Sequence, residues 1–188
     1  MVKKYLIVLL AAALALTACG GAASPAATPT PSEPWATHTE DALGIRVSYP
    51  EAWAVKSEDG GLYFSDNEAN FGSPVVPDGA GVVIATFPTA DFKNITDPVE
   101  LLNVYHENFQ ALGGVLEPDG EVETLTIHDN PAAFARYTGS MFDQPGAFTL
   151  TAIVHNDMAA AVFTMDTTAG GIHSERLRRI AESVEFLK

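Results

Sequence analysis

The sequence predicts an α+β domain built on a mostly antiparallel sheet, and two patterns carry this prediction. Short stretches of alternating apolar residues follow one another along the chain, and some are joined by turn sequences such as Asn156-Asp157. Two separated segments, 97–112 and the one that follows Gly170-Gly171, instead carry apolar residues at helical spacing. Hairpin strands with helices set apart from them are typical of the α+β class.

The beginning of the chain indicates a signal peptide over residues 1–18. Met1-Val2-Lys3-Lys4 is positively charged, and the apolar stretch 5–16 is too short to span a bilayer as a permanent helix. It ends in Leu16-Thr17-Ala18-Cys19, which resembles the bacterial lipobox: a leucine, two small residues and a cysteine. An ordinary signal peptide followed by a chance cysteine is the alternative interpretation.

The lipobox resemblance implies that Cys19 is the lipid attachment site and that the membrane is a partner of the protein. A diacylglycerol would be joined to the Cys19 sulfur by a thioether, and the leader would be cleaved after Ala18. Two or more acyl chains hold a protein stably at a membrane, whereas one chain holds it only marginally. We therefore expect an extracytoplasmic protein at the cell membrane, or at an outer membrane if the organism has one.

Residues 19–34 form the predicted tether between this anchor and the domain. Apart from Cys19 and Glu33, they are Gly, Ala, Ser, Thr and Pro. Such a segment cannot bury enough apolar surface to fold, and its prolines favour extended conformations. The folded domain is expected over residues 35–188. Cys19 is the only cysteine of the chain, so no internal disulfide stabilises that domain.

The first half of the domain indicates strands followed by a helix. Strands are expected at 35–39, 42–50, 62–65 and 82–87, with a polar loop at 66–81. The helix at 97–112 has three start signals, because Asp97 suits the N-cap, Pro98 the first helical position and Glu100 the capping box. Its apolar face is predicted to hold Leu102, Tyr105, Phe109 and Leu112.

The second half indicates two hairpins and a final helix. A turn at Asp129-Asn130 would place Ile127 opposite Ala132 and Glu123 opposite Arg136, although Pro131 also permits a longer loop with another register.

The Asn156-Asp157 turn would pair Val154 with Ala159 and Leu150 with Phe163. One face of this second hairpin is then wholly apolar, and the other is expected to be only partly covered. In the last helix, the side chains predicted to face the core are Leu177, Ile180, Ala181 and Val184.

The stretch Gly-Ile-Arg-Val-Ser-Tyr-Pro-Glu-Ala-Trp at 44–53 is similar to the start of PsbP-like (Mog1/PsbP-type) domains, where a short strand runs into Tyr-Pro-x-x-Trp. The order of the later parts also agrees, including Asn-Pro-Ala-Ala at 130–133 and a last helix that closes in Ala-Glu-Ser-Val-Glu-Phe at 181–186. The resemblance covers most of residues 35–188 and implies an α/β/α sandwich around an antiparallel sheet. It implies no reaction, because such domains serve as accessory subunits, assembly factors and binding modules. The family often has glycine where this chain has Asp129-Asn130.

The charge balance excludes one class of partner. The chain has 24 acidic and 10 basic residues, and Lys3 and Lys4 belong to the leader, which leaves eight basic residues in the mature chain. Such a surface repels phosphate groups, so we expect no nucleic acid partner. Anionic headgroups are disfavoured for the same reason, so membrane attachment has to be covalent.

Sequence patterns typical of catalysis are missing. The sequence contains no Gly-x-Ser-x-Gly elbow, no phosphate loop and no His-Glu-x-x-His. Its histidines are scattered, and none forms a ligand-spaced pair on one element: His38, His106, His128, His155 and His173. We therefore expect neither an enzyme nor a cofactor.

Two groups of residues are weak candidates for binding. Asp66, Glu68 and Asn70 alternate oxygen ligands in a loop, but the distal glutamate of a calcium loop is missing, so a solvated polar loop is the favoured interpretation. The acidic residues at 117, 119, 121 and 123 would alternate sides of a strand rather than chelate an ion. Five aromatic residues could line a pocket, although core packing is their more common use: Trp35, Tyr49, Trp53, Tyr63 and Phe64.

The sequence thus predicts a lipid-anchored lipoprotein whose PsbP-like domain is a non-catalytic interaction or accessory module for another protein of the cell envelope. The alternative is a lipoprotein that binds a small ligand or a metal ion, either with the 66–81 loop or with an aromatic-lined pocket.

Overall fold

The structure is a computed structural model that describes residues 33–188, apart from 59, 72–78, 142 and 188. The chain divides into two units after Ser32. The predicted signal peptide, the lipobox with Cys19 and most of the predicted tether therefore lie outside the described residues. In the described part, no helix combines the length and the apolar character that a membrane crossing needs.

An eight-stranded antiparallel sheet forms the centre of the second unit. Its strand order is β3-β4-β5-β10-β9-β8-β6, and β7 also pairs with β8. The strands are β3 (Ala54–Glu58), β4 (Gly61–Ser65), β5 (Ala80–Pro88), β6 (Gly114–Pro118), β7 (Glu123–Ile127), β8 (Asn130–Met141), β9 (Gln144–His155) and β10 (Met158–Asp166).

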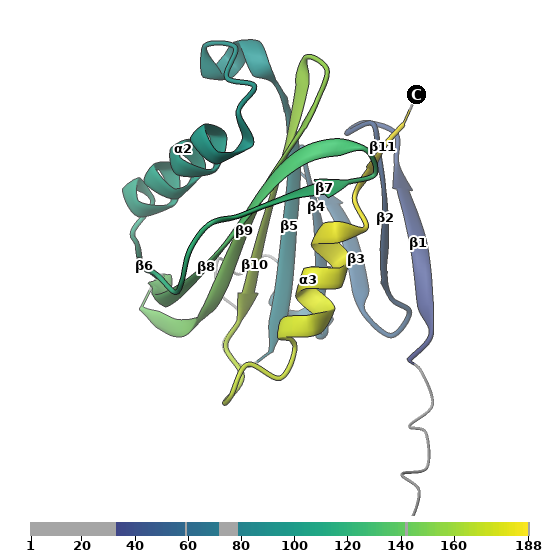
Figure 1. The fold of residues 1–188 in the computed structure, drawn as a ribbon. Helices are drawn as coiled ribbons and strands as arrows, with labels where there is room; N and C mark the ends of the chain where they lie inside the picture. Colours follow the sequence, from purple (N-terminus) through teal and green to yellow (C-terminus); the bar gives the residue numbers. More distant parts are fainter. Residues whose placement is uncertain (1–32, 59, 72–78, 142, 188) are drawn as a thin grey trace, which may run out of the picture. The chain divides into compact units, whose positions relative to one another are not determined.

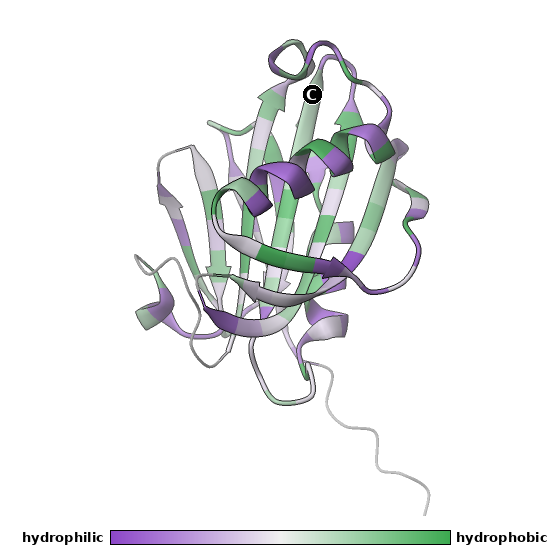
Figure 2. Ribbon diagram, turned by 90° about the vertical axis from the view of Figure 1, so that its left-hand side faces the viewer, coloured by the Kyte–Doolittle hydropathy of each residue, from purple (hydrophilic) through white to green (hydrophobic). Residues whose placement is uncertain are grey.

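Both faces of this sheet are covered (Figure 1). Helix α2 (Pro98–Ala111) lies on one face, and Figure 2 shows it crossing strands whose ribbons are largely apolar. The other face carries α3 (Ser174–Glu182) together with a three-stranded sheet of β1 (Trp35–Glu40), β2 (Ile45–Pro50) and β11 (Glu185–Phe186). Two short 3-10 helices complete the fold, η1 (Glu68–Asn70) and η2 (Thr89–Phe92). This mostly antiparallel arrangement with two helices confirms the predicted α+β class.

The core consists of two apolar clusters, one on each face of the large sheet. On the α3 side, Leu177 and Ile180 pack with Ile45 of β2 and with strand residues such as Ile153. On the α2 side, Leu101 and Leu102 pack with strand residues that include Leu150. Because side chains alternate along a strand, neighbouring residues of β9 contribute to opposite clusters.

The β9–β10 hairpin has the predicted register. Val154 pairs with Ala159, and Leu150 pairs with Phe163. Its second face is partly covered, as expected: Thr151, Thr164 and Asp166 are buried, whereas Thr149 and His155 stay partly exposed. The alternating pattern of one hairpin does not reveal that α3 and the small sheet pack over this face.

The β7–β8 hairpin differs from the predicted register by two residues. Ile127 pairs with Asn130, and the turn falls on His128 and Asp129, whose φ angles are +46° and +66°. Two residues with positive φ suit a tight hairpin turn, and the Asn130 side chain donates to the His128 carbonyl at 2.9 Å. A register shift of two residues leaves every side chain on its predicted face, because side chains alternate between the faces with a period of two.

Helix α2 begins as predicted but covers a different set of residues. The Asp97 side chain caps the helix by accepting from the Val99 backbone N–H at 2.8 Å. Leu102 and Tyr105 are buried as expected, whereas Leu112 is 64% exposed because the helix ends at Ala111. Leu101 is buried instead. Strands β6 and β11 were not predicted.

Candidate functional site

Asp166, the last residue of β10, is the centre of a polar network at the start of α3. It is only 2% exposed, and its carboxylate accepts from the backbone N–H groups of Thr168 at 3.0 Å and His173 at 2.9 Å. The Thr168 hydroxyl donates to the same carboxylate. Asp166 therefore holds the loop between β10 and α3 against the sheet, and it determines where the helix begins.

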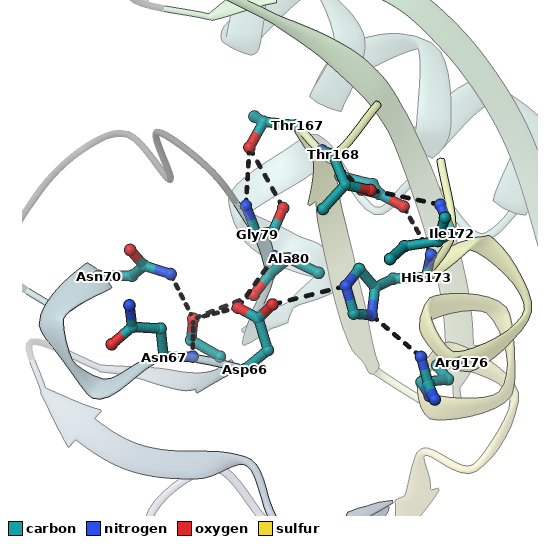
Figure 3. A network of polar contacts seen from close by, with 12 residues as sticks. Asp66, Asn67, Asn70, Gly79, Ala80, Thr167, Thr168, Ile172, His173 and Arg176 are labelled. Atoms are coloured by element: carbon teal, nitrogen blue, oxygen red, sulfur yellow. Dashed lines mark hydrogen bonds and ion pairs between the residues drawn. The ribbon is translucent and has the colours of Figure 1, made fainter. Parts of the chain in front are cut away.

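The same network reaches the ends of the loop between β4 and β5 (Figure 3). Asp66 accepts from the Ala80 backbone N–H at 3.0 Å, and its carboxylate lies 3.5 Å from Nε2 of His173. Thr167 donates its hydroxyl to the Gly79 carbonyl at 3.2 Å. These contacts join two loops and a helix that are far apart in the sequence.

The weak metal candidates take separate roles in this region. Asp66 belongs to the network above, and the Asn70 side chain donates to the Ser65 hydroxyl at 2.9 Å. Glu68 lies exposed in the first turn of η1. Within the described ranges, no three His, Cys, Asp or Glu side chains are placed to hold a metal ion together. An ion at the 66–81 loop stays a prediction, because residues 72–78 lie outside the described part.

A groove of about 240 Å³ opens beside the network, between α3 and strands β8, β9 and β10. It exists because α3 packs mainly against β2, β5 and β10 and leaves part of β8 and β9 uncovered. Phe134, Phe148 and Leu177 give the groove an apolar floor. The floor also contains the hydroxyls of Thr149 and Thr164, whose oxygens are 2.7 Å apart.

Charged residues of both signs surround this floor: Asp119, Arg136, Glu175 and Arg178. Arg178 lies 3.0 Å from Glu123 and 2.7 Å from Glu182, and its guanidinium stands over the Phe134 ring at 4.7 Å. Arg136 also contacts Glu123, at 3.4 Å, so the predicted ion pair is present in spite of the changed register. The two arginines are therefore held in defined positions at the rim.

Hydrogen bonds and burial shift the pKa of several side chains. The hydrogen bond from Arg178 lowers the pKa of Glu123, and the hydrogen bond from Ser57 lowers that of Glu40. Burial raises the pKa of the Tyr105 and Tyr137 hydroxyls. Each of these shifts reinforces the ordinary charge state of its group at neutral pH.

The predicted aromatic and histidine candidates mostly support the fold. Trp53 and Phe64 lie in the core on the α3 side. His106 stacks on Tyr137 with ring centroids 4.6 Å apart, and His155 stacks on Phe186 at 4.9 Å. His173 belongs to the Asp166 network.

Sequence reasoning did not single out Asp166 or the groove. The sequence does hold one signal for Asp166. It is an acidic residue at the end of a strand whose inward face is apolar, and a carboxylate that is buried there needs hydrogen-bond donors nearby. No local pattern joins Arg136 on β8 to Arg178 on α3, since only the packing of that helix brings them together.

The architecture, an antiparallel sheet with a helix on each face, matches the fold of solved PsbP- and Mog1-type structures. Among solved structures, the Ran-binding protein Mog1p of Saccharomyces cerevisiae matches with a TM-score of 0.58 and 10% identity, over 84% of this chain and 97% of that chain. PsbP (CyanoP) of Synechocystis matches with a TM-score of 0.51 and 13% identity, over 92% and 99%.

LpqN of Mycobacterium tuberculosis, described as involved in cell envelope biogenesis, matches with a TM-score of 0.52 and 14% identity, over 86% of this chain and 90% of that chain. The chain also spans 48% of a longer Bacteroides thetaiotaomicron protein, with a TM-score of 0.53 and 11% identity. No protein-family model matches the chain, and no curated protein matches its sequence. At these identities the likeness establishes the fold alone.

Proposed function

We propose that this protein is a lipid-anchored extracytoplasmic lipoprotein whose PsbP/Mog1-like domain is a non-catalytic accessory module that binds another envelope protein. The observation that carries the proposal is the groove beside α3, with its apolar floor and its rim of fixed charges. Protein interfaces commonly combine an apolar centre with a polar rim. Rim charges of both signs favour a partner with complementary charges.

Two further observations support this function. Residues 16–19 resemble a lipobox and follow a short apolar stretch, as expected of an exported and lipidated protein. The solved structures with the same fold include a Ran-binding protein and a protein involved in cell envelope biogenesis, which are compatible with a binding or accessory role.

Site-specific crosslinking tests the groove as the binding surface. A photoreactive residue is placed at Glu175, on the groove rim, in the full chain produced in its native cells. Glu107, exposed on α2 at the opposite face of the sheet, is the matched control position. A discrete adduct from position 175 that is missing from position 107, and that Arg136→Glu weakens, is expected. Equal adducts at both positions, or none at either, would contradict the proposal.

Membrane fractionation tests the anchor. Cys19→Ser removes the sulfur that would carry the lipid, so the protein should be released or remain as an unprocessed precursor. Ser24→Ala in the predicted tether is the matched control and should stay in the membrane fraction. Mature Cys19→Ser protein that still fractionates with membranes would overturn the lipoprotein assignment.

A further inference from the structure

A second pocket, of about 330 Å³, opens where the C-terminal end of α3 lies beside the three-stranded sheet. It is separate from the groove described above, because no residue lines both. All of its lining residues are polar or charged, and they come from β1, β2, β11, the end of α3 and the turn between β7 and β8. Two of them are arginines, Arg46 and Arg179.

Contacts between these elements hold the walls of the pocket in place. The Ser183 hydroxyl accepts from the Ser48 backbone N–H at 2.9 Å and donates to the Ser48 carbonyl at 3.0 Å, which joins the end of α3 to β2. Arg46 on β2 donates to Glu185 on β11 at 2.7 Å. The pocket is therefore formed by the fold itself and does not have to be shaped by a ligand.

Arg179 is the unusual residue of this pocket. Its guanidinium stands over the Trp35 ring, 3.8 Å from the ring centroid. Each of the other arginines contacts a glutamate: Arg46, Arg136, Arg176 and Arg178. Arg179 has no carboxylate partner in the described part of the chain, although the net charge of the protein is −14 and acidic residues far outnumber basic ones.

The Trp35 ring fixes the plane of the Arg179 guanidinium and covers one of its faces. The N–H donors of an arginine lie in that plane, so stacking leaves them available. Their fork matches two oxygens of a carboxylate or a phosphate. A side chain that is already fixed loses less conformational freedom when a ligand binds. Arg179 therefore presents a preorganised donor group for an oxyanion.

The glutamates of the pocket are suited to accept hydrogen bonds from the same ligand. Glu182 lies 2.7 Å from Arg178, and Glu185 lies 2.7 Å from Arg46, so each carboxylate is paired with a cation. Pairing reduces their repulsion of an anion, and a carboxylate has more acceptor sites than one arginine uses. The combination of an arginine without a carboxylate and two paired glutamates favours an anion that also carries hydroxyl groups.

We propose that this pocket binds an anionic monosaccharide, whose carboxylate or phosphate group pairs with Arg179 and whose hydroxyls donate to Glu182 and Glu185. The volume lies at the lower end of the range for small-molecule sites, which suits a single sugar ring. The site depends neither on the groove beside α3 nor on a protein partner.

Arginine side-chain NMR tests the proposal. The chain contains five arginines, so labelling with nitrogen-15 arginine gives five Nε–H signals from the full chain in lipid nanodiscs, and Arg179→Gln identifies one of them. D-glucuronate, glucose 6-phosphate and uncharged glucose are titrated at constant ionic strength. The Arg179 signal should shift and saturate with at least one anionic sugar. The affinity should be about tenfold above that of glucose, because one charge-assisted hydrogen bond contributes that much.

The two anionic sugars distinguish the group that binds. A response to glucuronate alone identifies a carboxylate site, and a response to glucose 6-phosphate alone identifies a phosphate site. Arg179→Gln should lower the affinity for the anionic sugar to that of glucose, followed through the Arg46 signal of the same pocket. Lys93→Gln, at an exposed position next to η2, removes the same charge outside the pocket and should leave the affinity unchanged.

Four results would overturn the proposal. Equal affinities for glucose and for both anionic sugars would remove the role of the charge. An Arg179 signal that shifts with neither anionic sugar would show that the pocket takes no such ligand. Equal shifts of all five arginine signals would indicate general screening of charge. Wild-type affinity in Arg179→Gln would place the ligand elsewhere.

Discussion

Replacing Asp166 by alanine should destabilise the domain more than any surface aspartate does. The side chain is buried at the end of β10 and accepts from two backbone N–H groups and from the Thr168 hydroxyl. Alanine would leave the N–H groups of Thr168 and His173 without an acceptor. It would also release the loop that leads into α3.

The contacts of Asp166 determine the expected size of the effect. Hydrogen bonds to a charged group contribute about 1.5–3 kcal/mol each, but water can reach the partly exposed loop and replace part of this. We therefore expect Asp166→Ala to lower the free energy of unfolding by about 3 kcal/mol. For a domain of this size the midpoint of thermal unfolding should fall by about 6–12 °C. Asp166→Asn keeps one acceptor oxygen and turns an amide group toward the other donors, so its loss should be intermediate.

Urea denaturation of wild type, Asp166→Ala and Asp166→Asn measures these differences in the free energy of unfolding. Asp119→Ala, at an exposed aspartate on the groove rim, is the control and should change the free energy of unfolding by less than about 0.5 kcal/mol. If Asp166→Ala costs no more than Asp119→Ala, the carboxylate does not hold the start of α3, and the interpretation of the network is wrong.

Two further predictions concern a close backbone approach and an ion pair. Gly139→Ala should cost about 3 kcal/mol of unfolding free energy, because Gly139 has a φ of +143° and an added Cβ would lie 1.8 Å from the Val115 carbonyl oxygen. Gly170→Ala, with open space around it, should cost about 1 kcal/mol, and equal losses in urea denaturation would refute the close approach. Arg178 lowers the pKa of Glu123 from its ordinary 4.5, so the ionised carboxylate stabilises the fold above that pH, and this contribution is lost as pH falls through the lowered pKa. Glu123→Gln should therefore lose less thermal stability than wild type between about pH 6 and pH 3, and identical pH profiles would contradict this.

Local patterns were sufficient for much of the sheet and for both helices. The β9–β10 register follows from the Asn156-Asp157 turn because the side-chain period of a strand leaves few pairings that keep one face apolar. The start of α2 follows from Asp97 and Pro98, whose preferences act within one turn of the helix. The β7–β8 turn was misplaced by one residue, which shifts the register by two, because both placements keep the same faces; the positive φ angles at His128 and Asp129 decide between them.

The candidate sites could not be predicted in the same way. The groove brings together Arg136 on β8 and Arg178 on α3, which lie far apart in the sequence. This combination depends on which strands a helix covers, and that is a property of packing between distant segments.

The sequence by itself determined the fold class and most strand boundaries, because these depend on short motifs and on periodicity within one element. Lipid attachment at Cys19 is a prediction from a motif of the same kind. Only the tertiary structure decided which residues of the second face of the β9–β10 hairpin are buried, that Asp166 is buried with its donors, and that the buried Tyr105 hydroxyl lacks a partner among the described residues. Burial and hydrogen-bond satisfaction are set by all the segments that surround a side chain, so they are decided only when the whole domain has packed.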